Sequence, residues 1–140
     1  AEEKATTYAK TQSETLRQAD VLVLTMPMWA GGPPAIIKAW IDQVMSPGLM
    51  YEYGPEGAKP LHQLRKVVLL VASGHCYKEN DPRDGLTPIF NNIFNHIGVP
   101  DIVLAWADGQ DTIFYSDSEE RKQMATEAAQ DLADEIAELP

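Results

Sequence analysis

Blocks of apolar residues along the chain predict three strands. Residues 21–26, VLVLTM, form a short run rich in β-branched side chains, which is typical of a strand buried on both faces. The run KVVLLVAS at residues 66–73 predicts a second strand, and residues 101–105 predict a third. Residues 46–65 are rich in glycine and proline, so we expect a loop there with a short extended piece at residues 50–53.

Apolar residues at helical spacing predict two helices in the first third of the chain. Residues 2–18 contain no glycine or proline and predict a weakly amphipathic helix. A second helix is predicted from Pro34, because proline suits a first helical turn, and it should stop before Pro47. Its apolar stripe comprises Ile36, Ile37, Trp40, Ile41 and Val44.

Two further helices are predicted from capping residues as well as periodicity. Thr87 and Pro88 suit the N-cap and the first position of a helix that Gly98 ends. Ser116 and Glu119 fit a capping box ahead of the last helix. The apolar stripe of that helix is expected to comprise Met124, Ala128, Leu132 and Ile136.

The order of these elements is helix, strand, helix, strand, helix, strand, helix. Such alternation predicts an α/β fold in which a parallel sheet is covered by helices on both faces. A chain of 140 residues is long enough for one core, so we expect residues 1–140 to form a single domain. No internal repeat or interdomain linker interrupts the pattern.

Composition and charge exclude several classes of function. The formal net charge of -10 disfavours nucleic acid as a partner, because the average field repels a polyanion. No apolar run approaches the roughly 20 residues of a membrane span, so we expect no membrane insertion. The single Cys76 and the absence of an apolar leader favour the cytoplasm. The scattered histidines have no metal-ligand spacing, so no metal is expected.

The loops that begin at Pro27 and Ala72 carry the candidate chemistry, because ligands of a doubly wound sheet bind beyond the carboxyl ends of its strands. The first loop offers Met28 and Trp29 as polarizable and flat surfaces, and its glycines let backbone amides approach a ligand. The second supplies a hydroxyl and a permissive glycine. Together the loops can hold a planar ring such as a flavin, but Trp29 can equally be a hydrophobic plug over the sheet edge.

The stretch PMWAGGPPAIIKAWIDQV, residues 27–44, resembles the segment after the third strand of the flavodoxin-like NAD(P)H:quinone oxidoreductase family. That family includes FMN-dependent NADH azoreductases, FAD-dependent quinone reductases and the ancillary oxidoreductases of potassium efflux. The resemblance continues through residues 54–57, 66–75 and 87–88. It implies a flavodoxin-like three-layer α/β/α fold with a parallel sheet, of which this chain carries the C-terminal three strands and their helices.

The resemblance also implies a cofactor and a reaction. Hydride passes from NADH or NADPH to FMN, or alternatively FAD, and then to a quinone or azo acceptor. The residues expected to contact the flavin ring are Pro27, Met28, Trp29 and Ala30, and those expected at its pyrimidine edge are Ala72, Ser73, Gly74 and His75.

His75 and Tyr77 are the candidate catalytic residues. They lie in the loop where quinone reductases of the family place a histidine and a tyrosine that move charge during hydride transfer. His75 replaces the second glycine of the family's pattern in this loop. Its imidazolium either pairs with the anionic reduced flavin, or His75 is a partly exposed loop histidine.

The family's phosphate-binding loop, which follows its first strand, has no counterpart before Val21. The strand at Val21 is therefore expected at an open edge of the sheet. We expect either a homodimer or a partner chain that supplies the first strands. Two alternatives to a flavin-dependent oxidoreductase stay open: a regulatory subunit of the potassium-efflux ancillary type, and a truncated, flavin-free domain that is inactive alone.

Overall fold

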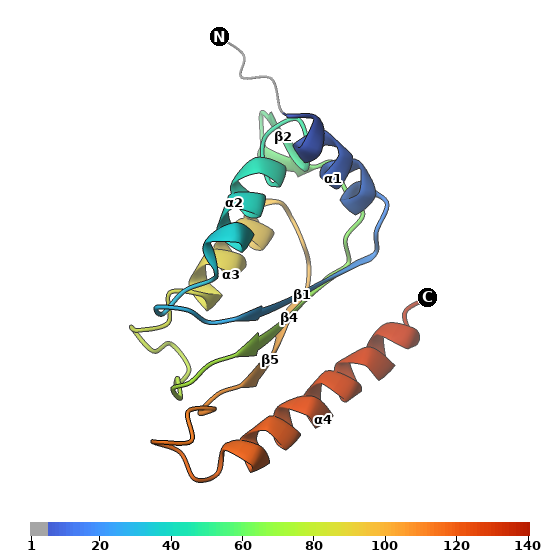
Figure 1. Ribbon diagram of the computed structural model, residues 1–140. Helices are drawn as coiled ribbons and strands as arrows, with labels where there is room; N and C mark the ends of the chain where they lie inside the picture. The colour runs from blue at the N-terminus through green and yellow to red at the C-terminus, as the bar shows by residue number, and fades with distance from the viewer. Residues whose placement is uncertain (1–5) are drawn as a thin grey trace.

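Helices and strands alternate as predicted in residues 6–140, the part of the chain that the computed structural model describes (Figure 1). The strands β1 (Val21–Pro27), β4 (Lys66–Ala72) and β5 (Ile102–Ala107) form a parallel sheet in the order β1-β4-β5. Among these described strands β1 lies at the edge, as expected. The predicted parallel sheet of three strands is therefore confirmed.

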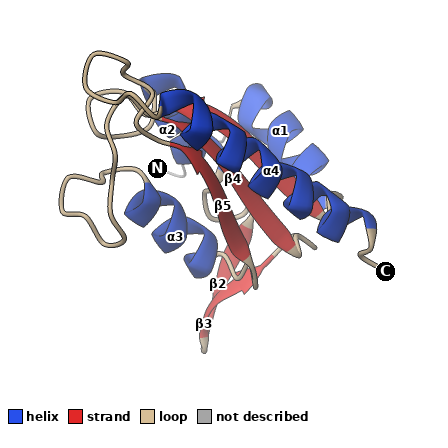
Figure 2. Ribbon diagram, turned by 90° about the horizontal axis from the view of Figure 1, so that it is seen from below, coloured by secondary structure: helices blue, strands red, loops and turns tan. Residues whose placement is uncertain are grey.

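Helices cover the two faces of this sheet unequally. The helices α1 (Thr7–Arg17), α2 (Ala35–Val44) and α3 (Thr87–His96) lie on one side, and α4 (Ser118–Ala137) lies on the other (Figures 1 and 2). The result is the predicted three-layer α/β/α arrangement. The part of the first predicted helix that precedes residue 6 lies outside the described residues.

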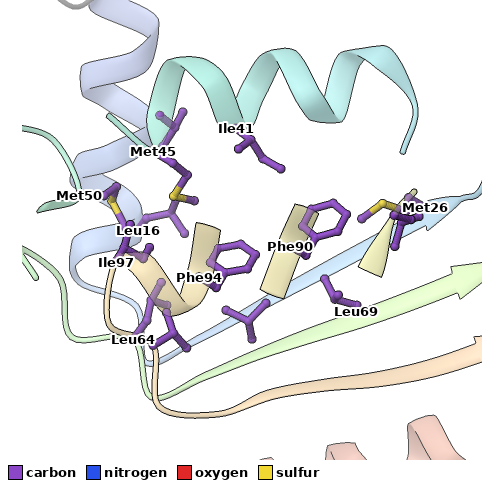
Figure 3. Packing of buried hydrophobic residues seen from close by; sticks show 14 of the residues in the cluster. Leu16, Met26, Ile41, Met45, Met50, Leu64, Leu69, Phe90, Phe94 and Ile97 are labelled. Atoms are coloured by element: carbon purple, nitrogen blue, oxygen red, sulfur yellow. The ribbon is translucent and has the colours of Figure 1, made fainter. Parts of the chain in front are cut away.

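The core fills the space between β4 and the helices α2 and α3. Phe90 and Phe94 are fully buried, and their ring centroids lie 6.2 Å apart with the ring planes nearly parallel. Because they are four residues apart on α3, both point to the same side of that helix. They face Ile41 of α2 and Leu69 of β4 (Figure 3). This packing fixes the distance between α3 and the sheet.

The two faces of β1 differ in burial. Met26 points into the core, whereas the side chain of Val23 is 48% exposed and Thr25 is exposed as well. Val23 and Thr25 point to the side of α4, since alternate residues of a strand face opposite ways. Because α4 packs mainly on β5, it leaves them uncovered. The prediction that residues 21–26 are buried on both faces is therefore wrong, while β4 is buried on both.

The start of α3 is shifted by one residue from its prediction. The N-cap is Leu86, and Thr87 is already helical. The carboxylate of Asp84 accepts hydrogen bonds from the N–H groups of Leu86 and Thr87, both at 2.9 Å. Asp84 thus performs the capping that the sequence assigned to Thr87. The predicted end is confirmed, because α3 stops at His96 and Gly98 has φ +84°.

The start of α4 and its inward face also differ from the prediction. Its N-cap is Asp117, so the capping box of Ser116 and Glu119 does not form. Met124 is 63% exposed. The half-buried residues that recur along the helix are Arg121, Ala125, Ala129, Leu132 and Ile136. In the first half of the helix, the inward-facing residues are Ala125 and Ala129 instead of the predicted Met124 and Ala128. Because alanine side chains are small, α4 can lie close to the sheet.

An antiparallel hairpin, β2 (Tyr51–Gly54) and β3 (Gly57–Pro60), follows α2. The extended piece predicted at residues 50–53 corresponds to β2. The second strand was not predicted, because glycine and proline at its ends hide a period of two. Gly57 has φ +110°, which only glycine adopts readily and which closes the turn.

We expect Tyr51 to make the stability of the fold fall at high pH. It is buried, with its ring edge-on to Tyr53 and His96, and burial with the neighbouring Tyr53 raises the pKa of Tyr51 to about 12. An unfolded chain releases this proton near pH 10, so the contribution is complete below that pH and is lost as the pH rises towards 12.

The expected loss is about 1 to 3 kcal/mol, and it should be absent in Tyr51→Phe, which has no phenol to ionise. Urea unfolding of both proteins between about pH 9 and 12 measures the difference. Equal slopes for the two proteins would show that Tyr51 is not the titrating group.

Candidate functional site

The loops after β1 and β4 leave the main sheet side by side. Pro27, the last residue of β1, is paired with Ala72, the last residue of β4. The N–H of Met28 donates to the carbonyl of Ala72 at 2.7 Å, which continues the pairing by one residue. The sequence-predicted residues 27–30 and 72–75 therefore start from one point on the sheet edge, as the topology required.

Trp29 stands on a tight turn at the start of the first loop. Its N–H donates to the carbonyl of Gly32 at 2.9 Å, and the N–H of Gly32 donates back at 3.0 Å. The two central residues, Ala30 and Gly31, have φ of +49° and +76°, as in a type I′ turn. Trp29 itself is 65% exposed. The indole is therefore held out from the fold, which excludes the alternative of a plug over the sheet edge.

Gly85 braces this turn from the loop that precedes α3. Its N–H donates to the carbonyl of Gly31 at 2.7 Å. A Cβ at position 85 would lie 2.6 Å from the same oxygen, closer than real contacts allow. The close approach of two main chains thus requires glycine here. It also links the position of the Trp29 turn to the segment between β4 and α3.

The second loop is held by the buried hydroxyl of Ser73. This hydroxyl accepts a hydrogen bond from Nε1 of Trp106 at 2.8 Å and donates one to the carbonyl of His75 at 2.7 Å. Ser73 is only 5% exposed. Its side chain is engaged in fixing the loop, so any contribution of the loop to a ligand comes from the neighbouring backbone.

Unpaired backbone donors gather on these two loops. Within residues 6–140, the N–H groups of Ala30, Gly31, Gly74 and His75 donate no hydrogen bond to the protein. Ala30, Gly74 and His75 are exposed, and Gly31 is half-buried. These donors belong to loops that start from paired strand ends, beside the exposed indole of Trp29. The arrangement suits a flat ligand that carries carbonyl oxygens and ring nitrogens as acceptors.

The two predicted catalytic residues have different surroundings. His75 is exposed, and its ring centroid lies 5.7 Å from that of Phe114. The ring of Tyr77 stacks on Trp106 with centroids 5.3 Å apart, and the guanidinium of Arg83 lies 5.4 Å from the Tyr77 centroid. Tyr77 is therefore packed against the end of β5, whereas His75 points to solvent from the same loop.

Sequence reasoning missed a third loop, residues 108–116, which follows β5. Its backbone N–H groups donate to the carbonyls of residues 73–75 in the second loop: Gly109 to His75 at 3.2 Å, Gln110 to Ser73 at 3.0 Å and Asp111 to Gly74 at 3.0 Å. The sequence did contain a signal for this loop, because the third predicted strand of a parallel sheet must end at the same edge as the other two. Its loop was overlooked because its residues, DGQDTIFYS, match no motif.

Ion pairs fix the loops around the site. Arg83 pairs with Asp81 at 2.6 Å and donates to the carbonyl of Cys76 at 3.3 Å. The Arg83 guanidinium holds the pKa of the Asp81 carboxyl well below its usual range. Arg121 of α4 pairs with Asp108 at 3.0 Å, at the beginning of the third loop. Both cations are thus neutralised by adjacent carboxylates and serve loop structure.

The described residues offer neither a metal site nor a membrane-spanning helix. In residues 6–140, no cluster of three or more histidine, cysteine, aspartate or glutamate side chains is arranged to hold a metal ion. No helix in the same part of the chain is long and apolar enough to cross a membrane.

The sequence model of a family described as having the flavodoxin-like fold matches residues 1–134. The chain belongs to this flavodoxin-like family. Two relatives are similar to the flavodoxin-like chain in sequence. An FMN-dependent NADH:quinone oxidoreductase of Beijerinckia indica is 34% identical over 99 residues, which are 69% of this chain and 49% of the relative. FMN-dependent NADH:quinone oxidoreductase 3 of Pseudomonas aeruginosa is 32% identical over 109 residues, 78% of this chain and 51% of that protein.

The flavodoxin-like architecture is also found in solved structures. The crystal structure of an azoreductase from Bacillus anthracis superposes with a TM-score of 0.80 at 23% identity, covering 91% of this chain and 62% of that one. This similarity concerns the fold. The flavodoxin-like chain spans about half the length of the two relatives described above, 49% and 51%.

Proposed function

We propose that this chain binds the ring of FMN and serves an NADH-dependent oxidoreductase that reduces quinones or azo compounds. The observation that carries the proposal is the set of unpaired N–H groups at Ala30, Gly31, Gly74 and His75, beside the exposed Trp29. The relatives named FMN-dependent NADH:quinone oxidoreductase support the choice of cofactor and reaction.

The residues present suit a flavin ring through their hydrogen-bond donors and the flat indole of Trp29. Its pyrimidine part offers carbonyl oxygens and ring nitrogens, and Gly74 and His75 present N–H donors on the loop assigned to that part. Trp29, which is 65% exposed, supplies the flat surface that would flank the ring. Met28, which the sequence predicted beside the ring, is buried in the core and adds nothing to this surface. The loops are braced by Gly85 and Ser73 before any ligand arrives, so little ordering is needed on binding.

The contribution of the chain to catalysis is electrostatic. FMN, when bound, supplies the hydride chemistry. The N–H groups of Gly74 and His75 would stabilise negative charge at the pyrimidine edge of a bound ring, because they lie on exposed residues and donate to no acceptor within residues 6–140. An imidazolium at His75 would add a positive charge at the same edge. Tyr77 acts as a packing residue for this loop, through Trp106.

The proposal also covers the hydride donor and the oligomeric state of the protein. NADH donates the hydride, with NADPH as the alternative, and FAD is the alternative to FMN. The protein works in the cytoplasm as a homodimer or with a partner chain that pairs with the edge strand β1.

A flavin titration of the purified chain tests this function. We expect FMN fluorescence to be quenched on binding, the bound flavin to be bleached by NADH without oxygen, and its colour to return when a quinone is added. FAD and NADPH are run in parallel. A chain that binds neither flavin at millimolar concentration would contradict the proposal. If FMN binds but NADH does not bleach it, the function of the chain would be limited to cofactor binding.

Trp29→Ala should weaken FMN binding about three- to tenfold, which corresponds to the loss of one aromatic contact. The matched control is Tyr8→Ala, since Tyr8 is also exposed, at 54%, and lies on α1 away from the loops (Figure 1). If the two variants have equal affinities for FMN, Trp29 does not contact the flavin ring.

A further inference from the structure

The loop after β5 displays two neighbouring apolar side chains to water. Ile113 is 85% exposed and Phe114 is 67% exposed. Neither contributes burial to the core, so folding stability does not explain why this loop carries them. Exposed apolar side chains that adjoin each other commonly contact a ligand or another protein.

The tip that carries these side chains is ordered by its own backbone. A carboxylate oxygen of Asp111 accepts a hydrogen bond from the N–H of Ile113 at 3.0 Å. The carbonyl of Asp111 accepts from the N–H groups of Phe114 and Tyr115, both at 3.0 Å. The turn therefore holds Ile113 and Phe114 in place although their side chains are not buried.

The base of the same loop is attached to the proposed ring site. The N–H groups of Gly109, Gln110 and Asp111 bind the three carbonyls of residues 73–75. The ring of Phe114 lies 5.7 Å from the ring of His75, at an angle of 42°. The tip thus stands beside the second loop, at the end of the sheet where the loops after β1 and β4 also lie (Figure 1). Trp29 lies in the first of these loops.

We propose that Phe114 and Ile113 form the apolar wall of the subsite that receives the electron acceptor, and that they select flat aromatic acceptors such as quinones. The inference rests on the proposed function, because the acceptor must come to the ring held by the two loops. Phe114 offers a face of its ring to the acceptor and exchanges neither proton nor electron. It is a specificity-determining residue, and an acceptor without an aromatic surface gains nothing from it.

The test compares two acceptors with Phe114→Ala. We expect KM for a naphthoquinone to rise about three- to tenfold, while the rate with ferricyanide and the affinity for FMN stay unchanged. Phe114→Tyr, which keeps the aromatic face, should restore the low KM. Tyr8 is an exposed aromatic residue on α1. Its variant Tyr8→Ala is the control, and it should change neither KM for naphthoquinone nor the rate with ferricyanide.

Each other outcome overturns the inference, and the readouts separate its failure from that of the proposed function. If Phe114→Ala binds FMN and its KM for naphthoquinone is unchanged, the proposed function stands, but Phe114 does not contact the acceptor. A fall in molecular mass of Phe114→Ala on ultracentrifugation would show that the tip is a contact between copies of the chain. If the unsubstituted chain does not bind FMN in the flavin titration, the proposed function is wrong, and the inference about the acceptor is wrong as well.

Discussion

Replacing Phe90 by alanine is expected to lower the free energy of unfolding by about 3 to 5 kcal/mol. Phe90 is fully buried between α2 and β4, where it stacks with Phe94 (Figure 3). Truncation removes the apolar area of the ring and leaves a cavity that the flanking helix and strand cannot close. Since whole domains are stable by about 5 to 15 kcal/mol, this single change should remove much of the total.

Chemical denaturation followed by circular dichroism measures this loss. Phe114→Ala is the matched control, because it makes the same chemical change at a side chain that is 67% exposed. We expect the control to shift stability by less than about 0.5 kcal/mol. A Phe90→Ala protein as stable as the control would show that the packing of α3 on the sheet is not as described.

Replacing Gly85 by alanine should disturb both stability and ligand binding. The added Cβ would lie 2.6 Å from the carbonyl oxygen of Gly31, a backbone atom that cannot rotate away. The two main chains must separate, and the 2.7 Å hydrogen bond between them is lost. We expect a destabilisation of about 1 to 3 kcal/mol. Because the Trp29 turn moves with Gly31, FMN affinity should fall by at least about tenfold.

Gly32→Ala provides the control for this prediction. Gly32 lies on the same turn, but a Cβ there would meet the carbonyl of Gly85 at 3.8 Å, an ordinary contact. Gly32 also has no positive φ that alanine would resist. Its variant should keep the affinity for FMN within about twofold. If Gly32→Ala and Gly85→Ala weaken FMN equally, the effect comes from the turn sequence and not from the brace.

The sequence was sufficient to predict the sheet and the meeting of the two loops. The apolar runs ending at residues 26 and 73 are β-branched and continuous, and parallel strands must end at a common edge. The position of Trp29 could not be predicted in the same way. A tryptophan after a strand fits a plug or a ligand wall, and the 65% exposure that rules out the plug results from the turn and is not visible in the residue pattern.

The parts that the sequence did not reveal depend on contacts between distant segments. The hydrogen bond from Trp106 to Ser73 joins residues 33 apart in the chain, and nothing local to Ser73 indicates it. The brace from Gly85 to Gly31 is of the same kind. The N-cap of α3 was misplaced because the carboxylate of Asp84 accepts from the N–H groups of Leu86 and Thr87, and the helix begins one residue earlier. As an N-cap, Thr87 would instead have accepted from N–H groups two or three residues after it. Short-range rules do not decide between such acceptors.

If the proposed function is correct, a flavin ring lies against the backbone donors of the two loops. Amide NMR spectra of the labelled chain, recorded while riboflavin is added, test it without any contribution from a phosphate. We expect the largest shifts on the N–H signals of Ala30, Gly31, Gly74 and His75, which no protein acceptor engages within residues 6–140. Unmoved signals at these four positions, with shifts concentrated elsewhere on the chain, would contradict it.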